Sequence, residues 1–218
     1  MKLKNKKIQI SCDGGAATGK STGAKMIAKK YNLKFLSSGL LYRYAAYLIL
    51  KHKPKNELFL LRKNFSKLSY KQLGRINLHT QNISQHSSKI AKNNEIRKIL
   101  KKFQINFSNK FKNCCIEGRD ISTKILPKSD VKFFFKCNLT IAAKRRYKEL
   151  KKFDPNIKLK NVKNALRIRN LLDINRKHSP LLRHRNSIEI DTGKLSKQAM
   201  LIKMTKYVEK VLLKKYGN

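Results

Sequence analysis

One stretch decides the fold: Ile8-Gln9-Ile10-Ser11-Cys12-Asp13-Gly14-Gly15-Ala16-Ala17-Thr18-Gly19-Lys20-Ser21-Thr22. It begins as a short apolar run, breaks at glycines, and leads into apolar residues at helical spacing, namely Ala24, Ile27, Ala28 and Tyr31. Within it, Gly14, Gly19, Lys20 and Ser21 satisfy G-x-x-x-x-G-K-[ST], the phosphate-binding loop. A strand, a glycine loop and a helix in this order are the context that the motif requires, which disfavours a chance match.

The chemistry of this loop follows from its residue types. Small residues let backbone N–H groups curl around a phosphate, and the following helix adds its positive N-terminal dipole. The Lys20 ammonium can reach the outer phosphates, and the Ser21 hydroxyl can hold a Mg²⁺ ion that bridges them. We expect the charge of Lys20 to be compensated only when a nucleotide binds.

Length and composition fit one globular α/β domain. The chain has 218 residues, of which 40% are hydrophobic. No run approaches the roughly 18 consecutive apolar residues of a membrane span. The apolar run after the basic segment Met1 to Lys7 leads straight into the glycine loop, which argues against a secretory signal. We therefore expect a cytoplasmic monomer without a membrane partner.

The charge balance is strongly basic. Lys and Arg number 53 against 12 Asp and Glu, for a formal net charge of +41. One interpretation is that the protein binds nucleic acid. The other is a general lysine-rich composition, in which lysines are distributed over every exposed surface. Because the lysines are spread along the chain and aromatic residues are not interleaved with them, we favour the second and expect no specific nucleic acid as partner. Such charge still attracts polyanions.

Strand and helix patterns alternate along the chain and predict a parallel sheet buried on both faces. Asn138 and Ser196 are placed to cap the helices after the last two strands. From Lys51 to about Ser88 the pattern is irregular, and we interpret it as an insertion with limited structure of its own; helical spacing resumes at Ile90. The expected strands are 8–12, 35–37, 114–116, 131–137 and 187–191.

Further stretches follow the phosphate loop in a family's order: Ser38-Gly39-Leu40-Leu41-Tyr42-Arg43, Glu117-Gly118-Arg119-Asp120, Ala143-Lys144-Arg145-Arg146-Tyr147, Arg169…Asp173…Arg176, Pro180-Leu181 and Ile190-Asp191-Thr192. Together they resemble the bacterial cytidylate kinases, within the P-loop nucleoside monophosphate kinases, over almost the whole chain. The resemblance implies a single domain over 1–218 with a three-layer α/β/α fold and a five-stranded parallel sheet of order 2-3-1-4-5. It also implies a short monophosphate-binding insert at about 51–96 and a helical lid at about 151–165.

The activity that the resemblance implies is transfer of the γ-phosphoryl group of ATP to CMP or dCMP, with Mg²⁺, in pyrimidine nucleotide metabolism. It implies that ATP is bound by Gly14, Gly15, Ala16, Ala17, Thr18, Gly19, Lys20, Ser21 and Thr22, with Ser21 as metal ligand. It implies a catalytic set of Lys20, Arg119, Arg145, Arg146 and Arg176, in which Arg145 and Arg146 lie near the transferred group.

The same resemblance implies a CMP site. Positions matching Arg43, Arg119 and Arg176 hold the acceptor phosphate, those matching Arg169 and Asp173 bind its sugar, and those matching Ser88, Arg97 and Asp120 read cytosine; Ser38 and Tyr42 complete the set. A carboxylate suits the cytosine amino group and is repelled by the uracil carbonyl. The alternative for Asp120 is that it orients Arg119, and each arginine taken singly could be a surface cation.

The chain departs from the family's pattern at several positions. Ser21 stands where Gly is usual, Ser37 replaces an acidic residue, and Glu117 stands where Asp is common. Asn170 and Leu172 replace an acidic and a basic residue of the lid-side motif, and the insert is short. Two alternatives therefore stay open: a related P-loop kinase acting on UMP or shikimate, and a basic RNA-binding protein that uses a nucleoside triphosphate as a switch.

Overall fold

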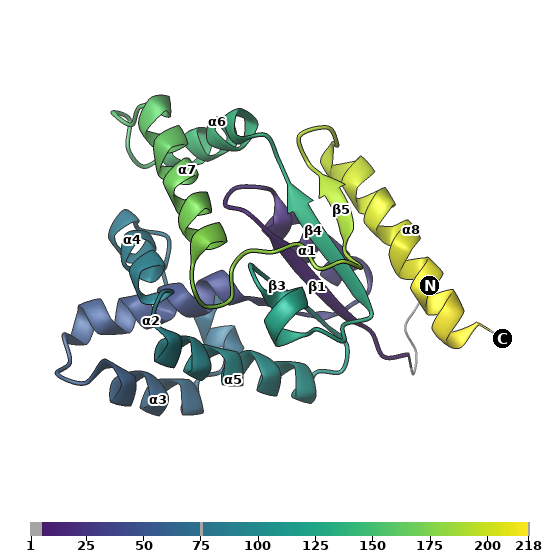
Figure 1. The fold of residues 1–218 in the computed structure, drawn as a ribbon, viewed down its shortest axis with the longest axis horizontal. Helices are drawn as coiled ribbons and strands as arrows, with labels where there is room; N and C mark the ends of the chain where they lie inside the picture. Colours follow the sequence, from purple (N-terminus) through teal and green to yellow (C-terminus); the bar gives the residue numbers. More distant parts are fainter. Residues whose placement is uncertain (1–5, 75, 218) are drawn as a thin grey trace. The chain divides into compact units, whose positions relative to one another are not determined.

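The computed structural model describes residues 6–74 and 76–217. It contains a five-stranded sheet of order β2-β3-β1-β4-β5, with parallel pairing of β1 to β3, of β1 to β4 and of β4 to β5 (Figure 1). This confirms the predicted sheet and its order. The strands are β1 (Gln9–Gly14), β2 (Lys34–Ser37), β3 (Cys114–Gly118), β4 (Val131–Lys136) and β5 (Ile188–Asp191).

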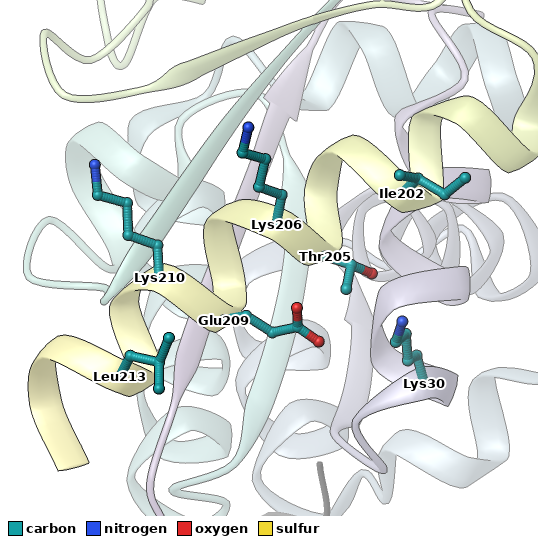
Figure 2. A pocket seen from close by; sticks show the side chains of 7 residues that line it. All are labelled: Lys30, Ile202, Thr205, Lys206, Glu209, Lys210 and Leu213. Atoms are coloured by element: carbon teal, nitrogen blue, oxygen red, sulfur yellow. The ribbon is translucent and has the colours of Figure 1, made fainter. Parts of the chain in front are cut away.

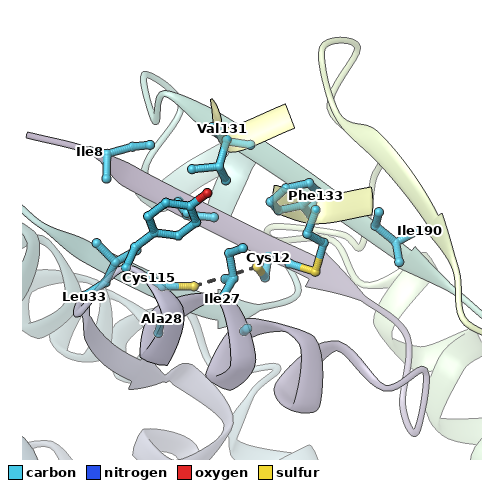
Figure 3. Close-up of a cluster of buried hydrophobic side chains, with 14 of the residues drawn as sticks. Ile8, Cys12, Ile27, Ala28, Leu33, Cys115, Val131, Phe133 and Ile190 are labelled. Carbon is cyan, nitrogen blue, oxygen red and sulfur yellow. Dashed lines mark hydrogen bonds between the residues drawn. The ribbon is translucent and has the colours of Figure 1, made fainter. Parts of the chain in front are cut away.

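The chain divides into two compact units, of which the second is Leu36–Phe111 and the first is made of the chain on either side of it. In the first unit, α1 (Lys20–Lys30) and α8 (Lys197–Tyr216) pack on each other and on the sheet. Figure 3 shows the core beneath them, where Ile8, Ile27 and Phe133 are fully buried. Each such side chain contributes about 1.5–3 kcal/mol by leaving water, so this core anchors the strand that precedes the phosphate loop.

A smaller core joins the phosphate loop to two further helices of the first unit. These are α6 (Leu139–Leu150) and α7 (Leu159–Asn175), which meet through Ala143, Val162 and Leu166, and Ala16 of the loop lies in the same cluster. The side chains of Asn138 and Ser196 accept hydrogen bonds from Thr140 N–H and Ala199 N–H. Both predicted helix caps are thereby confirmed.

The second unit is helical, and the prediction of limited structure from Lys51 to Ser88 is wrong. It holds α2 (Ser38–His52), α3 (Glu57–Lys67), the 3-10 helix η1 (Tyr70–Gly74), α4 (Gln81–Ile90) and α5 (Asn94–Lys110). Side chains of Asn56, Thr80 and Asn93 cap α3, α4 and α5 by accepting backbone N–H groups. The prediction failed because the helices that lie wholly within that segment bury few residues; α3 buries only Leu61 and Phe65.

Within the described ranges 6–74 and 76–217, no helix is both long enough and apolar enough to span a bilayer. The described cysteines are all free thiols, and Cys12 Sγ lies 3.9 Å from Cys115 Sγ inside the core (Figure 3). Burial raises the pKa of Cys12 well above the ordinary value of a thiol, so Cys12 is held in the protonated, unreactive form.

Candidate active site

The phosphate loop leaves β1 and enters α1, which is the local context that the sequence predicts. Gly19 is the residue before α1 and has φ +78, a left-handed conformation that favours glycine. Gly14 has no room for a side chain, because a Cβ there would lie 2.4 Å from the carbonyl oxygen of Phe135. The Thr18 hydroxyl donates to Gly15 O at 3.0 Å across the loop. Both motif glycines are therefore required by the backbone itself.

Lys20 is buried, at 7% exposure, with its ammonium turned toward the loop. Nζ donates to Gly15 O at 3.2 Å and lies 3.8 Å from Glu117 Oε2, at the end of β3. The expectation that its charge has no partner without nucleotide is thus wrong. Burial, and after it the positive charge of Arg119, lower the pKa of Lys20 to about 7, while Glu117 opposes the shift. Near neutral pH this lysine is therefore protonated in part of the molecules and neutral in the rest.

Two arginines and two carboxylates form a cluster in the same unit. Arg119 Nε donates to Asp173 Oδ2 at 2.8 Å, and Arg176 Nη1 lies 3.5 Å from Asp173 Oδ1. Arg176 Nη2 lies 3.8 Å from Asp120 Oδ1, and Arg176 Nε donates to the carbonyl oxygen of Ser179. Burial opposes ionisation of Asp173, but Arg119, Arg169 and Arg176 outweigh it and lower its pKa. The structure therefore brings together four of the predicted acceptor-site residues.

Asp13 anchors the segment that carries Asp120, and sequence reasoning assigned it no role. Its carboxylate is fully buried and accepts Ile121 N–H at 2.8 Å, Ser122 N–H at 2.7 Å and the Ser122 hydroxyl at 2.5 Å, all from the π-helical turn η2 (Ile121–Ile125). Burial raises the pKa of Asp13 to about 6, against these hydrogen bonds. The available signal was a carboxylate in an otherwise apolar strand directly before the glycine loop.

Replacing Asp13 by Asn is expected to destabilise the protein by about 1–3 kcal/mol, because the amide nitrogen cannot accept and leaves a buried donor of Ser122 unmatched. Urea unfolding measures this loss. Ser122→Ala is the matched control, since it removes a donor without orphaning one, and it should cost less. Equal losses in the two variants would contradict the anchoring role.

The two lid arginines differ in their contacts. Arg145 donates to Thr192 Oγ1 at 3.1 Å and to Thr192 O at 2.7 Å, in the turn after β5. Arg146 pairs with Glu149 at 2.9 Å one helical turn away, in a more exposed position. Arg145 is therefore fixed against the segment that borders the phosphate loop, whereas Arg146 makes a local surface pair.

The remaining predicted residues lie in the second unit. The Arg97 guanidinium stacks 5.5 Å from the centroid of the Tyr42 ring and donates to Ala91 O at 3.2 Å, and only 6% of Arg97 is exposed. Arg43 Nη1 lies 2.8 Å from His79 Nδ1, and the Ser88 hydroxyl donates to Ser84 O. Ser38 is buried at the start of α2. Within this unit the structure thus pairs Tyr42 with Arg97.

A groove of about 550 Å³ lies elsewhere in the first unit, between α1 and α8. Lys30, Lys206 and Lys210 surround the apolar side chains of Ile202 and Leu213 along it (Figure 2). The residues that line it include none of the predicted site residues. The cluster around Lys20 and Arg119 remains the candidate active site of the first unit.

A parallel sheet of this order, with a glycine loop between its central strand and a helix, defines a P-loop kinase fold with three α/β/α layers. Two solved structures share the fold: shikimate kinase from Bacteroides thetaiotaomicron (TM-score 0.51, 10% identity, covering 93% of this chain and 98% of that one) and TT1252 from Thermus thermophilus (TM-score 0.53, 14% identity, covering 94% and 98%).

The family model for cytidylate kinase matches residues 10–210, and the chain belongs to the cytidylate kinase family. It is 35% identical over 212 residues to the cytidylate kinase of Bartonella tribocorum, covering 95% of this chain and 97% of that protein. It is 32% identical over 222 residues to the cytidylate kinase of Clostridium tetani, covering 97% and 98%.

Proposed function

We propose that this protein is a cytidylate kinase, which transfers the γ-phosphoryl group of ATP to CMP or dCMP and releases ADP with CDP or dCDP. One observation carries the proposal beyond family membership. The buried Lys20 of the phosphate loop and the Arg119–Asp173–Arg176 cluster lie in one compact unit, and Arg119 is close enough to shift the pKa of Lys20. Cations for donor and acceptor phosphates are thereby available side by side.

The mechanism rests on positioning and charge neutralisation, because phosphoryl transfer needs little covalent help from protein. Loop N–H groups and Lys20 hold the donor phosphates, and Arg119 and Arg176 hold the acceptor phosphate with their planar donor forks. The Arg119 guanidinium leaves Asp173 Oδ2, 2.8 Å away, as it takes up phosphate. The carboxylate thus orients the arginine before substrate arrives. Arg145 and Arg146 add positive charge from the lid.

The family implies ATP, usually with Mg²⁺, and the chain's residues fit this ion. Ser21 follows Lys20 in the first turn of α1 and is half-buried. The described residues contain no group of three or more His, Cys, Asp or Glu placed to hold a metal ion. We therefore assign Ser21 as protein ligand and the nucleotide phosphates as the others. Bound there, Mg²⁺ would neutralise part of the phosphate charge.

We assign the second unit to the acceptor nucleotide, with 51–96 as the monophosphate-binding insert and Ser38, Tyr42, Arg43, Ser88 and Arg97 as its contacts. The lid is 151–165. Its exposed turn before α7 includes Phe153 at 87% exposure, so little burial holds that turn in place, whereas Val162 at its α7 end is buried. Arg169 and Asp173 contact the sugar.

Both substrates are metabolites of the cytoplasm. We therefore propose that the enzyme acts in the cytoplasm, and we propose that it is a monomer.

Asp120→Ala is expected to narrow the ratio of kcat/KM for CMP to that for UMP by roughly one to two decades. A buried carboxylate accepts from the cytosine amino group and repels the uracil carbonyl, and an unmatched buried polar group costs about 1–3 kcal/mol. Asp120 is 6% exposed, so water does not mask this difference. If Asp120 serves only to orient an arginine, both substrates suffer equally and the ratio stays as in wild type.

The pH profile tests the role of Lys20. Only the charged ammonium binds phosphate, so kcat/KM for ATP should fall as the pH rises above about 7, by up to about tenfold per unit. kcat should fall only at higher pH, because bound phosphates raise the pKa of Lys20 in the complex. Lys20→Arg, whose guanidinium stays charged, should flatten the profile. A wild-type kcat/KM that is constant from about pH 6 to about pH 9 contradicts this assignment.

The proposed reaction is tested with a coupled assay for ADP, with CMP, dCMP, UMP, AMP and shikimate supplied in turn. CMP and dCMP should support turnover far better than the other acceptors. Preference for UMP or shikimate would select the related kinase. ATP turnover that depends on RNA and on none of these acceptors would select the nucleic-acid-binding alternative.

A further inference from the structure

Two side chains from outside the phosphate loop hold the peptide groups that precede Ala16 and follow Thr18, with Ala17 between them. The Ala16 N–H donates to Asn170 Oδ1, from α7, at 2.9 Å. The Thr18 carbonyl accepts from the Thr192 hydroxyl, in the turn after β5, at 2.8 Å. Thr18 and Thr192 are 5% and 4% exposed, so neither group of that bond is served by bulk water. The loop is thus fixed at two points, one before and one after a three-residue segment centred on Ala17.

Ala17, between these points, has φ +56. The left-handed region places Cβ against the following carbonyl oxygen, so a non-glycine residue avoids it unless its surroundings impose it. The two hydrogen bonds supply such surroundings, because they hold the 15–16 and 18–19 peptide groups and so fix both ends of the three-residue segment with Ala17 at its centre. The loop therefore holds a shape that its own sequence disfavours at this residue.

Thr192 is also the point at which the loop meets Arg145. Its hydroxyl donates to Thr18 O and accepts from Arg145 Nη1 at 3.1 Å, and its backbone N–H donates to Lys136 O at 3.0 Å, at the end of β4. The methyl group lies close to Gly19, since a Cβ added at Gly19 would be 3.4 Å from Thr192 Cγ2. A valine has the same shape but can neither donate nor accept, so it tests the hydroxyl alone.

We propose that Asn170 and Thr192 are positioning residues that clamp the phosphate loop around the left-handed Ala17 and so preform it for the donor phosphates. The inference rests on the proposed use of ATP and extends it, because it names what holds the loop before nucleotide arrives. Asn170 does this as a neutral acceptor, which adds no negative charge beside the phosphates. Thr192 does it while bound to Arg145, which joins the loop to α6.

The test measures the Kd of a non-hydrolysable ATP analogue and the hydrogen exchange of the loop amides in the free protein. Thr192→Val and Asn170→Leu each leave a loop peptide group without its partner, so each should raise Kd by about 5- to 100-fold and speed exchange of residues 15–19. Thr192→Ser keeps the donating hydroxyl, and Asn170→Asp keeps an accepting oxygen. In both variants the exchange of residues 15–19 should therefore stay as slow as in wild type. In Thr192→Val and Asn170→Leu, kcat at saturating ATP should fall less than kcat/KM for ATP. A general loss of folding would instead lower both quantities equally.

The substitution Ala17→Gly provides a second test of the clamp. Glycine adopts positive φ without the Cβ conflict, so the clamp becomes less necessary. In the Thr192→Val background, Ala17→Gly should bring Kd back to within about threefold of wild type. Unchanged Kd and exchange in both Thr192→Val and Asn170→Leu, or no rescue by Ala17→Gly, would overturn the proposal. If Thr192→Val does not fold, Asn170→Leu decides. A wild type that binds the analogue but does not phosphorylate CMP would defeat the proposed function and leave the clamp intact.

Discussion

Lys20→Met is expected to lower kcat by about 10²–10³-fold, the usual effect of removing one preorganised charge from a transition state. The ammonium lies inside the loop, 3.2 Å from Gly15 O, where the transferred charge must be neutralised. Methionine keeps the length and the apolar stem of the side chain without its charge. Because burial already lowers the pKa of Lys20 to about 7, the fold gains little from its charged form, and the loss of stability should be small beside the loss of kcat.

Lys29→Met is the matched control, because Lys29 lies on the same helix but is exposed to solvent. It should keep kcat within about twofold of wild type, as expected for a solvated surface lysine. Thermal unfolding of both variants separates loss of chemistry from loss of structure. Near-normal turnover of Lys20→Met at an unchanged melting temperature would refute the assignment of the phosphate loop.

Arg176→Met is expected to destabilise the protein by about 3–5 kcal/mol and to raise KM for CMP by at least tenfold. Removing one partner of a buried charge network leaves the others without compensation. The Arg176 side chain is only 8% exposed and faces Asp120 and Asp173. Urea unfolding gives the stability change, and steady-state kinetics at saturating ATP give KM for CMP.

Arg183→Met is the control that separates the effect of burial from the effect of losing an ion pair. Arg183 also pairs with a carboxylate, Glu189 at 3.2 Å, but half of its side chain is exposed. Such surface pairs contribute about 0–1 kcal/mol, so this variant should lose little stability and no activity. If Arg176→Met and Arg183→Met were equally mild, the cluster would be a solvated surface network and the acceptor-phosphate role would lose its support.

The sheet could be predicted because its strands are near-continuous apolar runs, and the phosphate loop because its spacing is specific. The strand ends moved by a residue or two, as at β4, which ends at Lys136 rather than Cys137. The helices α3 and α4 were missed because their stability comes from caps and a few buried contacts rather than from an apolar stripe. A sequence pattern therefore indicates a helix or strand that buries a large apolar face, but it gives little sign of one that buries only a few residues.

Contacts across long sequence separations could not be predicted. Glu117 faces Lys20 because β1 and β3 pair in a register that sets Cys12 beside Glu117, and no spacing in the sequence encodes that register. The bond from Ser122 to Asp13 spans 109 residues, and the one from Thr192 to Thr18 spans 174. The resemblance supplied the cations of the site together with Asp120 and Asp173, but it gave no role to Asp13, Glu117 or Thr192.

The scarce carboxylates explain how a chain of charge +41 keeps an ordered cationic site. Of the 12 acidic residues, Asp13, Glu117 and Asp120 are buried, and Asp173 lies between two arginines. Surface lysines need no partner because water solvates them, whereas buried cations do. Glu117, Asp120 and Asp173 thus lie where desolvation makes a partner for the buried cations necessary.

The central claim is tested most directly by following the label from [γ-³²P]ATP in the presence of CMP and Mg²⁺ and separating the products by chromatography. The account predicts that the label appears in CDP in proportion to the ADP formed, and that Lys20→Met abolishes this transfer while Lys29→Met does not. Label that appears in inorganic phosphate, or that stays in ATP while CMP is unchanged, would contradict it.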